Sequence, residues 1–311
     1  MSNTSTSSKD LLIIGCGDIG VRLARLVQAQ GGEVSALARS KESAARLEGY
    51  GITPLSGNLD QVESLVDLPV AGKSLVYLAP PPGGGPIDSR VRKFCQSCIG
   101  TQVPEKVVYV STSGVYGDCG GALVDEQTPV NPQTSRAKRR VDAEHCLTEW
   151  GREQGVPVVI LRVTGIYGPG RLPIARLKQG HPVLQESESP PTNRIHADDL
   201  AQVCLAALER GAAGAIFNVS DGQPGTMTQY FTAIADLLGL PLPPQVSMEE
   251  ARQVMNPMML SYLSESRRMD NRKMLEELGV VLQYPDLAAG LQNIAEQLEN
   301  PNMGYLGSIG H

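Results

Sequence analysis

The chain has 311 residues, of which 41% are hydrophobic and 19% are charged, and its formal net charge is −6. The hydrophobic content is sufficient for a sizeable core, which aliphatic side chains must fill because aromatic residues make up only 4% of the chain. The acidic balance argues against a nucleic-acid partner, and no apolar run reaches the roughly 18 residues that a membrane span requires.

The chain begins with a short polar segment, residues 1–9, that is rich in Ser and Thr. It lacks the apolar stretch of a signal peptide, so we expect a disordered tail there and a second tail over residues 301–311. The six cysteines are scattered, which is typical of reduced thiols in a cytoplasmic protein. Cys95 and Cys98 form one isolated Cys-x-x-Cys pair in a helical stretch, so we expect a buried helix face there and no metal site.

Apolar runs that predict strands alternate with helical patterns through the first two thirds of the chain. The predicted strands are Leu11–Ile14, Val34–Ala38, Ile52–Leu55, Ser74–Ala79, Lys106–Ser111 and Pro157–Val163. The predicted helices between them cover residues 18–30, 41–48, 60–67, 87–101 and 135–152. Such alternation predicts an α/β fold with a parallel, doubly wound sheet of the Rossmann type that helices cover on both faces.

The pattern changes after Gly168-Pro169-Gly170, where helices begin to dominate. The predicted elements are helices over 172–179, 198–210, 226–238, 248–256, 270–278 and 286–299, with one strand at Ala215–Val219. We therefore expect a nucleotide-binding domain over residues 10–170. A smaller, mostly helical substrate lobe is expected over 171–300, packed on the sheet and interleaved with it. In such sheets ligands bind beyond the carboxyl ends of the strands.

The first predicted strand runs directly into a Gly-x-Gly-x-x-Gly motif that opens a helix. This order is the dinucleotide-binding fingerprint, in which the first glycine allows a tight turn and the second lets a pyrophosphate approach the backbone. The third glycine lets the helix pack close to the strand, and the free N–H groups of the helix N-terminus face the phosphates. The predicted pyrophosphate-binding turn consists of Gly15, Cys16, Gly17, Asp18, Ile19 and Gly20.

The second predicted strand ends in Arg39 and Ser40, where an acidic residue would bind the ribose 2′-hydroxyl of NAD. An arginine suits a 2′-phosphate through its charge and its planar set of donors, so NADP(H) is predicted in preference to NAD(H). The alternative is that Arg39 is a solvated charge that opens the next helix. The remaining predicted cofactor contacts are Asn58 and Leu59 beside the adenine, and Leu78, Ala79 and Pro80 at the end of the fourth strand.

The segment from Ser111 to Gly117 reads Ser-Thr-Ser-Gly-Val-Tyr-Gly. It resembles the Ser-Ser-x-x-Val-Tyr-Gly segment of extended short-chain dehydrogenases/reductases, the group that includes NAD-dependent sugar-nucleotide epimerases and dehydratases. Further matching segments follow in the same order, and the resemblance covers about residues 10 to 300. They are Leu161-Arg162, Gly165-Ile166-Tyr167-Gly168-Pro169-Gly170, Arg194-Ile195-His196 and Phe217-Asn218-Val219.

The resemblance implies a catalytic Ser/Thr, Tyr and Lys, of which only the first is matched here, by Thr112. The Tyr position holds Arg136 and the Lys position holds Arg140, four residues apart on one helix face. Arg140 could hold the ribose or a phosphate, but Arg136 stays protonated and cannot transfer a proton. A second register, which pairs Thr134 with Lys138, also lacks the Tyr, so the resemblance is to an atypical member.

Three side chains could replace the missing proton-transfer group: Tyr116, Tyr167 and His196. Each is equally compatible with a packing role in its loop. The resemblance implies an NAD(P)-dependent oxidoreductase or epimerase/dehydratase-like protein that acts on a carbonyl, an alcohol or a nucleotide-sugar-like small molecule. The substrate would be anionic if it binds Arg171, Arg176 or Lys178, which otherwise form a solvated helix face. The alternative is an NADP-binding sensor or assembly module without turnover, and a homodimer is compatible with either.

Overall fold

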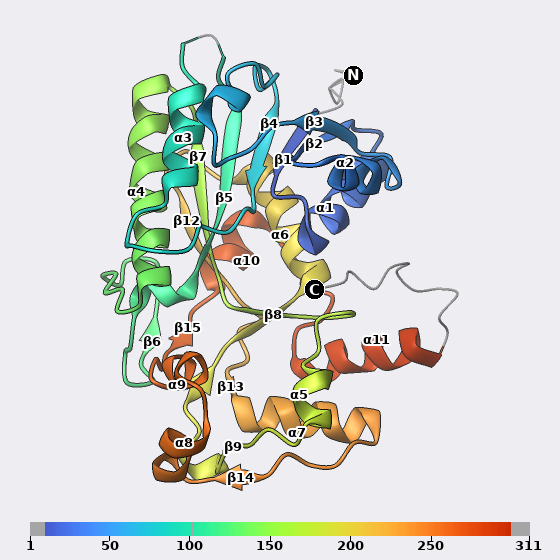
Figure 1. Ribbon diagram of the computed structural model, residues 1–311, viewed down its shortest axis with the longest axis vertical. Helices are drawn as coiled ribbons and strands as arrows, with labels where there is room; N and C mark the ends of the chain where they lie inside the picture. Colours follow the sequence, from blue (N-terminus) through green and yellow to red (C-terminus); the bar gives the residue numbers. More distant parts are fainter. Residues whose placement is uncertain (1–9, 101, 300–311) are drawn as a thin grey trace.

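A computed structural model describes residues 10–100 and 102–299 of the chain (Figure 1). The two predicted tails, residues 1–9 and 301–311, lie outside this described part. The central element is a sheet of seven parallel strands in the spatial order β12-β7-β5-β4-β1-β2-β3. These strands are β1 (Leu11–Ile14), β2 (Val34–Ala38), β3 (Thr53–Ser56), β4 (Ser74–Tyr77), β5 (Lys106–Thr112), β7 (Val158–Val163) and β12 (Ile216–Val219).

Helices cover both faces of the sheet (Figure 1). They are α1 (Asp18–Ala29), α2 (Lys41–Glu48), α6 (Ala197–Arg210) and α10 (Arg272–Leu278) on one face, and α3 (Ser89–Ser97) and α4 (Ser135–Gln154) on the other. Leu11 and Ile13 of β1 pack into the first core, and Leu12 and Ile14 pack into the second. Because successive side chains of a strand point to opposite faces, a strand that is apolar at every position is buried on both sides.

The order of the strands reverses between β1 and β4, which are neighbours in the sheet although β2 and β3 lie between them in sequence. Doubly wound sheets bind their ligands at this switch point, beyond the carboxyl ends of the strands. The turn from β1 into α1 lies at this edge. The fold therefore brings the glycine motif to the expected place for a dinucleotide.

The last third of the chain divides between the sheet and a second group of elements, drawn below the sheet in Figure 1. The helices of this group are α5 (Ile174–Lys178), α7 (Met227–Leu238), α8 (Met248–Val254), α9 (Pro257–Leu263) and α11 (Leu287–Glu299). Four short strand pairs form separate two-stranded sheets outside the main sheet: β8 (Gly165–Tyr167) with β11 (Arg194–His196), β10 (Pro191–Thr192) with β13 (Gly225–Thr226), β9 (Val183–Leu184) with β14 (Gln245–Val246), and β6 (Leu123–Val124) with β15 (Arg268–Met269). The core of the second group includes Tyr230, Phe231 and Leu291.

The α3–α4 pair contains the isolated Cys-x-x-Cys motif. Cys95 and Cys98 are buried against the sheet, as predicted for a helix face, and the Cys95 Sγ lies 3.8 Å from the Cys146 Sγ of α4.

Neither the 20-residue α4 nor any other helix of the described part is long and apolar enough to cross a membrane.

Most predicted elements are confirmed to within two or three residues, but residues 60–67 and 87–101 required correction. The helix predicted over 60–67 is only a 3-10 turn, Val62–Leu65. The helix predicted over 87–101 is shorter, because the Asp88 carboxylate caps it at one end and regular structure stops after Ser97. Helix α9 was not predicted, because its seven residues show no clear period. The short strand pairs were not predicted either, because two or three residues are too few to show one.

Candidate functional site

The glycine turn has the geometry that a dinucleotide requires. Gly15 has φ +85°, and a Cβ there would lie 2.5 Å from the backbone nitrogen of Ala79. Only glycine therefore allows the chain that leaves β1 to pass so close to the chain that leaves β4. A Cβ at Gly20 would lie 2.9 Å from the Cys16 Sγ. By contrast, no described residue other than its two chain neighbours lies within 4 Å of a Cβ built at Gly17, which caps α1 without a side-chain hydrogen bond. The backbone is therefore open at Gly17, and these residues fit a pyrophosphate.

The first turn of α1 contains one carboxylate, Asp18, which two arginines neutralise. Its oxygens accept hydrogen bonds from Arg22 Nε at 2.9 Å and from Arg171 Nη1 at 3.1 Å. Arg22 also donates to Asp198 at 2.5 Å. Arg171 comes from the segment before α5, so this contact ties the glycine turn to the second group of elements.

The residues predicted to contact the adenosine ribose lie at the end of β2, and those predicted to lie beside the adenine follow β3. Arg39 is exposed at the end of β2, while the Ser40 hydroxyl accepts a hydrogen bond from Ser43 N as the cap of α2. Hydrogen bonds from Arg90 are the main cause of the lowered pKa of Asp60, and the charge of Arg39 contributes to it. Asp60 directly follows the predicted contacts Asn58 and Leu59, so the charge of Arg39 acts on the loop that contains them.

Sequence reasoning missed Arg46, seven residues after Arg39 on α2. Its Nη2 donates to the backbone oxygen of Cys16 at 2.7 Å. Its Nη1 is buried and has no hydrogen-bond partner among the described residues. Its place on the helix that directly follows Arg39 and Ser40 was the available signal. An unsatisfied guanidinium N–H beside the glycine turn is a donor for an anionic ligand.

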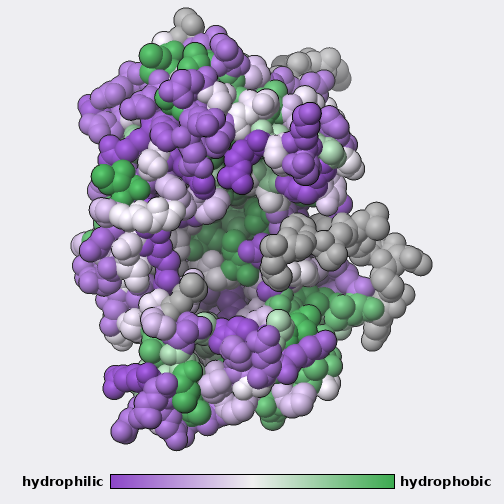
Figure 2. All heavy atoms as spheres, in the orientation of Figure 1, coloured by the Kyte–Doolittle hydropathy of each residue, from purple (hydrophilic) through white to green (hydrophobic). Residues whose placement is uncertain are grey.

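A cavity of about 400 Å³ lies at the carboxyl ends of β5 and β7, where the sheet meets the second group of elements. Figure 2 shows one face of the molecule, hollowed between these two parts. Four arginines and one carboxylate are among its lining residues, together with Thr112: Arg136, Arg171, Arg194, Arg267 and Glu265. This excess of positive charge suits an anionic ligand.

Of the predicted catalytic residues, the structure brings Thr112 and Arg136 to this cavity but not Arg140. Thr112 ends β5, and its hydroxyl accepts a hydrogen bond from Gly114 N at 3.2 Å. Arg136 packs its guanidinium 4.0 Å from the centre of the Tyr262 ring in α9. Arg140 Nη1 instead donates to the Tyr109 hydroxyl and the Val110 carbonyl, both at 3.0 Å.

Tyr116 occupies a structural position instead of the predicted catalytic one. It is 1% exposed, and its hydroxyl donates to Asn218 Oδ1 at 2.8 Å and accepts from Arg162 Nη1 at 3.0 Å. Burial raises the pKa of this phenol. Because the hydroxyl has its partners inside the protein, it has no access to a substrate in the cavity.

Tyr167 is among the residues that line the cavity, whereas His196 is not, but both have polar groups held by internal partners. The Tyr167 hydroxyl donates to the Asp286 carbonyl at 3.1 Å. His196 is fully buried and caps α6, where its Nδ1 accepts from Asp198 N at 3.3 Å. Burial lowers the pKa of His196 to about 4, so it is neutral at physiological pH.

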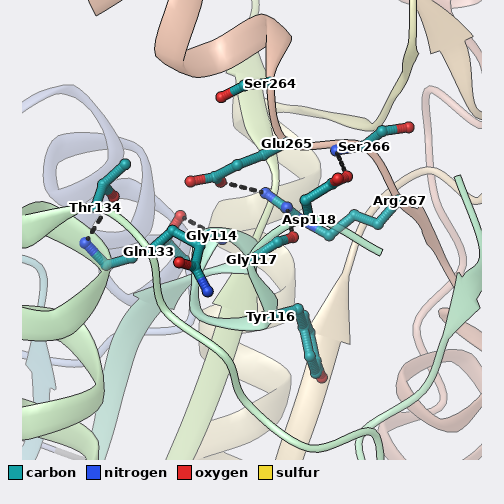
Figure 3. Close-up of polar contacts among 12 residues, drawn as sticks. Gly114, Tyr116, Gly117, Asp118, Gln133, Thr134, Ser264, Glu265, Ser266 and Arg267 are labelled. Carbon is teal, nitrogen blue, oxygen red and sulfur yellow. Dashed lines mark hydrogen bonds and ion pairs between the residues drawn. The ribbon is translucent and has the colours of Figure 1, made fainter. Parts of the chain in front are cut away.

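Sequence reasoning also missed Glu265 and Arg267, which lie between α9 and β15. Figure 3 shows them over the Gly114–Gly117 turn, with Tyr116 pointing away. Arg267 Nη1 donates to the Gly117 carbonyl, and its Nη2 donates to Glu265 Oε2 at 3.3 Å. The other carboxylate oxygen, Oε1, is buried without a partner in the described part of the chain. No motif marks these residues, because only tertiary folding brings them to Thr112.

Replacing Asp221 with Asn is expected to stabilise the protein at alkaline pH. Asp221 follows β12 and is 6% exposed, and burial raises its pKa to about 7. Since this lies above the unfolded value of about 3.9, the carboxyl contributes fully to stability below about pH 4, and that contribution is lost as pH rises through 7. In urea unfolding, the free energy of unfolding of the variant, relative to that of the unchanged protein, should rise by about 2–4 kcal/mol between pH 5 and pH 8.5. A stability gap that does not widen with pH would contradict this assignment.

Comparisons with known proteins indicate the family and the fold of the chain. A model of the NAD dependent epimerase/dehydratase family matches residues 90–220. Protein YeeZ of Escherichia coli (strain K12) is 27% identical over 292 residues, which cover 89% of this chain and 97% of YeeZ. Among solved structures, a functionally unknown conserved protein from Silicibacter pomeroyi DSS has 31% identity and a TM-score of 0.78, covering 94% of this chain and 100% of that one.

A second solved structure, the dTDP-glucose 4,6-dehydratase DesIV from Streptomyces venezuelae, has NAD bound. It is 21% identical with a TM-score of 0.74, over 94% of this chain and 98% of that one. At this identity the likeness establishes the fold alone.

Proposed function

Because the chain belongs to the NAD dependent epimerase/dehydratase family, we propose that it uses a nicotinamide dinucleotide to oxidise or reduce a carbonyl or alcohol group of a small molecule. The observation that carries this proposal is the shared location of the unobstructed backbone at Gly17 and of the cavity that Thr112 lines. Both lie at the carboxyl edge of one sheet. A cofactor and a substrate bound at this edge would be neighbours.

The residues proposed to hold the cofactor are those whose geometry fits it. The glycine turn and the N-terminus of α1 would bind the pyrophosphate. When bound, the nicotinamide supplies or accepts a hydride. Thr112 would hydrogen-bond the reacting oxygen, because its hydroxyl already accepts one bond from Gly114 N and keeps its proton to donate.

The proposed preference for NADP(H) rests on two arginines near the predicted ribose position. Arg39 is exposed at the end of β2, and Arg46 has an unsatisfied N–H beside Cys16. A 2′-phosphate would pair with guanidinium groups through strong, charge-assisted hydrogen bonds.

An anionic substrate is proposed because arginines dominate the cavity. Arg194 is 7% exposed and packs against the Tyr230 ring, while Arg171 is more accessible and borders the glycine turn. Names of relatives point to nucleotide sugars, since the human dTDP-D-glucose 4,6-dehydratase is 27% identical over 142 residues, 43% of this chain. We propose the broader class, an anionic small molecule with a carbonyl or alcohol group.

A specific observation favours a second function, that of a nucleotide-binding module without turnover. Arg136 stands where the family has its Tyr, and it is engaged by Tyr262 and by Ser261 Oγ at 3.3 Å. Turnover decides between the two functions. NADPH oxidation is followed by absorbance while aldehydes, ketones and nucleotide sugars are added in turn. Oxidation with any of them supports the enzyme, whereas tight binding without oxidation across the panel supports the module.

Replacing Arg39 with Asp is expected to weaken NADPH binding at least 10-fold relative to NADH. The substitution removes a partner of the 2′-phosphate and installs a carboxylate, which repels the phosphate and accepts a bond from a 2′-hydroxyl. Fluorescence titrations with both nucleotides measure the ratio. The exposed Arg152 on α4 offers a control, because Arg152→Asp makes the same change in net charge far from the turn. An unchanged ratio in Arg39→Asp would refute the proposed role of Arg39.

A further inference from the structure

Carbonyl reduction in the cavity requires a proton-transfer group, and the residue at the position of the family's Tyr does not provide one. Reduction of a carbonyl places negative charge on its oxygen, and a positioned acid typically accelerates such a step by 10²–10⁴-fold. Arg136 cannot act as this acid, because a guanidinium does not lose its proton in proteins. The phenols of Tyr116 and Tyr167 are tied to internal partners. That of Tyr230 has its pKa raised to about 12 by burial.

Glu265 is the carboxylate among the residues that line this cavity. Its side chain is 7% exposed, and its two oxygens differ in their hydrogen-bond partners. Oε2 is held by Arg267, which is itself fixed to the Gly117 carbonyl. Oε1 has no partner within the described residues, although it is buried. Leaving a buried carboxylate oxygen unsatisfied is unfavourable, so a ligand that hydrogen-bonds Oε1 would remove that penalty on binding.

The carboxylate also lies beside the threonine that would orient the substrate oxygen. A Cβ built at Gly114 would be 3.6 Å from Thr112 Oγ1 and 3.8 Å from Glu265 Oε2, so both oxygens lie within 4 Å of one point. Figure 3 shows the Glu265 carboxylate directed over the Gly114 turn. Both side chains therefore border Gly114, and a substrate oxygen bound between Thr112 Oγ1 and the Glu265 carboxylate would be in reach of both.

We propose that Glu265 is the acid–base residue of this protein, and that it takes the role which the family gives to the Tyr. The assignment rests on the proposed oxidoreductase function. In the reducing direction the O–H bond at Oε1 breaks and an O–H bond forms on the substrate oxygen. The carboxylate is left ionised beside Arg267 and regains its proton from solvent. The two electrons and the hydrogen at carbon come from the reduced dinucleotide. In the oxidising direction the ionised Oε1 accepts the proton of the alcohol.

The test measures NADPH oxidation with the same panel of aldehydes, ketones and nucleotide sugars, together with NADPH affinity by fluorescence. Glu265→Gln keeps the side chain's size and its bond to Arg267 but cannot transfer a proton. It should bind NADPH as the unchanged protein does and lose 10²–10⁴-fold in rate. Asp118→Asn makes the same carboxylate-to-amide change outside the cavity. Asp118 Oδ1 accepts bonds from the backbone of Gly120 and Ser266, which the amide can preserve, so its rate should be unchanged.

Chemical rescue separates proton transfer from a structural role. Formate or acetate should restore activity to Glu265→Ala in proportion to its concentration, because a small acid can occupy the vacated space. Activity of Glu265→Gln within threefold of the unchanged protein would overturn the assignment. So would a rate loss in both variants that no external acid restores. If the unchanged protein binds NADPH but oxidises it with no compound of the panel, the proposed function fails, and the role of Glu265 fails with it.

Discussion

Replacing Arg162 with Met is expected to lower the free energy of unfolding by about 3–5 kcal/mol. Arg162 lies in β7 at 5% exposure, and its Nη2 donates to Glu144 Oε2 at 2.8 Å. Glu144 is 3% exposed, and its other oxygen accepts a bond from the Ser111 hydroxyl at 2.5 Å. The substitution leaves the Glu144 carboxylate buried without its cation, and it also removes a partner of Tyr116. Urea unfolding at neutral pH measures the loss.

The double variant Arg162→Met/Glu144→Leu provides the matched control. Removing both charges avoids the cost of burying one alone, so at least half of the lost stability should return. If the free energy of unfolding of the single variant falls by less than 1 kcal/mol, the Arg162–Glu144 ion pair does not hold α4 against the sheet. If the double variant is no more stable than the single one, the lost stability comes from packing and not from an unpaired buried charge.

Replacing Gly17 with Ala is expected to weaken dinucleotide binding at least 10-fold while the fold is retained. Within residues 10–100 and 102–299, nothing beyond the two chain neighbours lies within 4 Å of the added methyl group, so its neighbour there would be the bound pyrophosphate. The loss of glycine at the cap of α1 should cost about 1 kcal/mol or less. Titration with NADPH and thermal unfolding of the same preparation give the two values.

Gly15→Ala is the informative contrast, since its methyl group would overlap Ala79 at a backbone φ of +85°. That variant should lose stability first and binding as a consequence. If Gly17→Ala binds NADPH as well as the unchanged chain, the turn does not hold the pyrophosphate.

The sheet and the glycine turn could be predicted because their determinants are local. β1, the turn and the start of α1 are contiguous, and the fully apolar strand already indicates burial on both faces. The cavity could not be predicted in the same way. Glu265 and Arg267 follow a helix of seven residues that shows no clear period, and they meet Thr112 only through tertiary packing.

The status of Tyr116 illustrates a different limit. The motif identified the residue, but side-chain direction decides its role. The chain turns after Thr112 so that Tyr116 faces Arg162 and Asn218 in the interior. Arg46 was missed because a lone arginine on a polar helix is usually solvated. Its approach to Cys16 depends on how α2 packs beside the turn.

Titration calorimetry of the unchanged chain with NADPH and NADH tests the central claim most directly, namely that the turn at Gly15–Gly20 binds a dinucleotide. We expect saturable one-to-one binding of NADPH, with weaker binding of NADH. The absence of heat of binding for both nucleotides at millimolar concentration would contradict the claim.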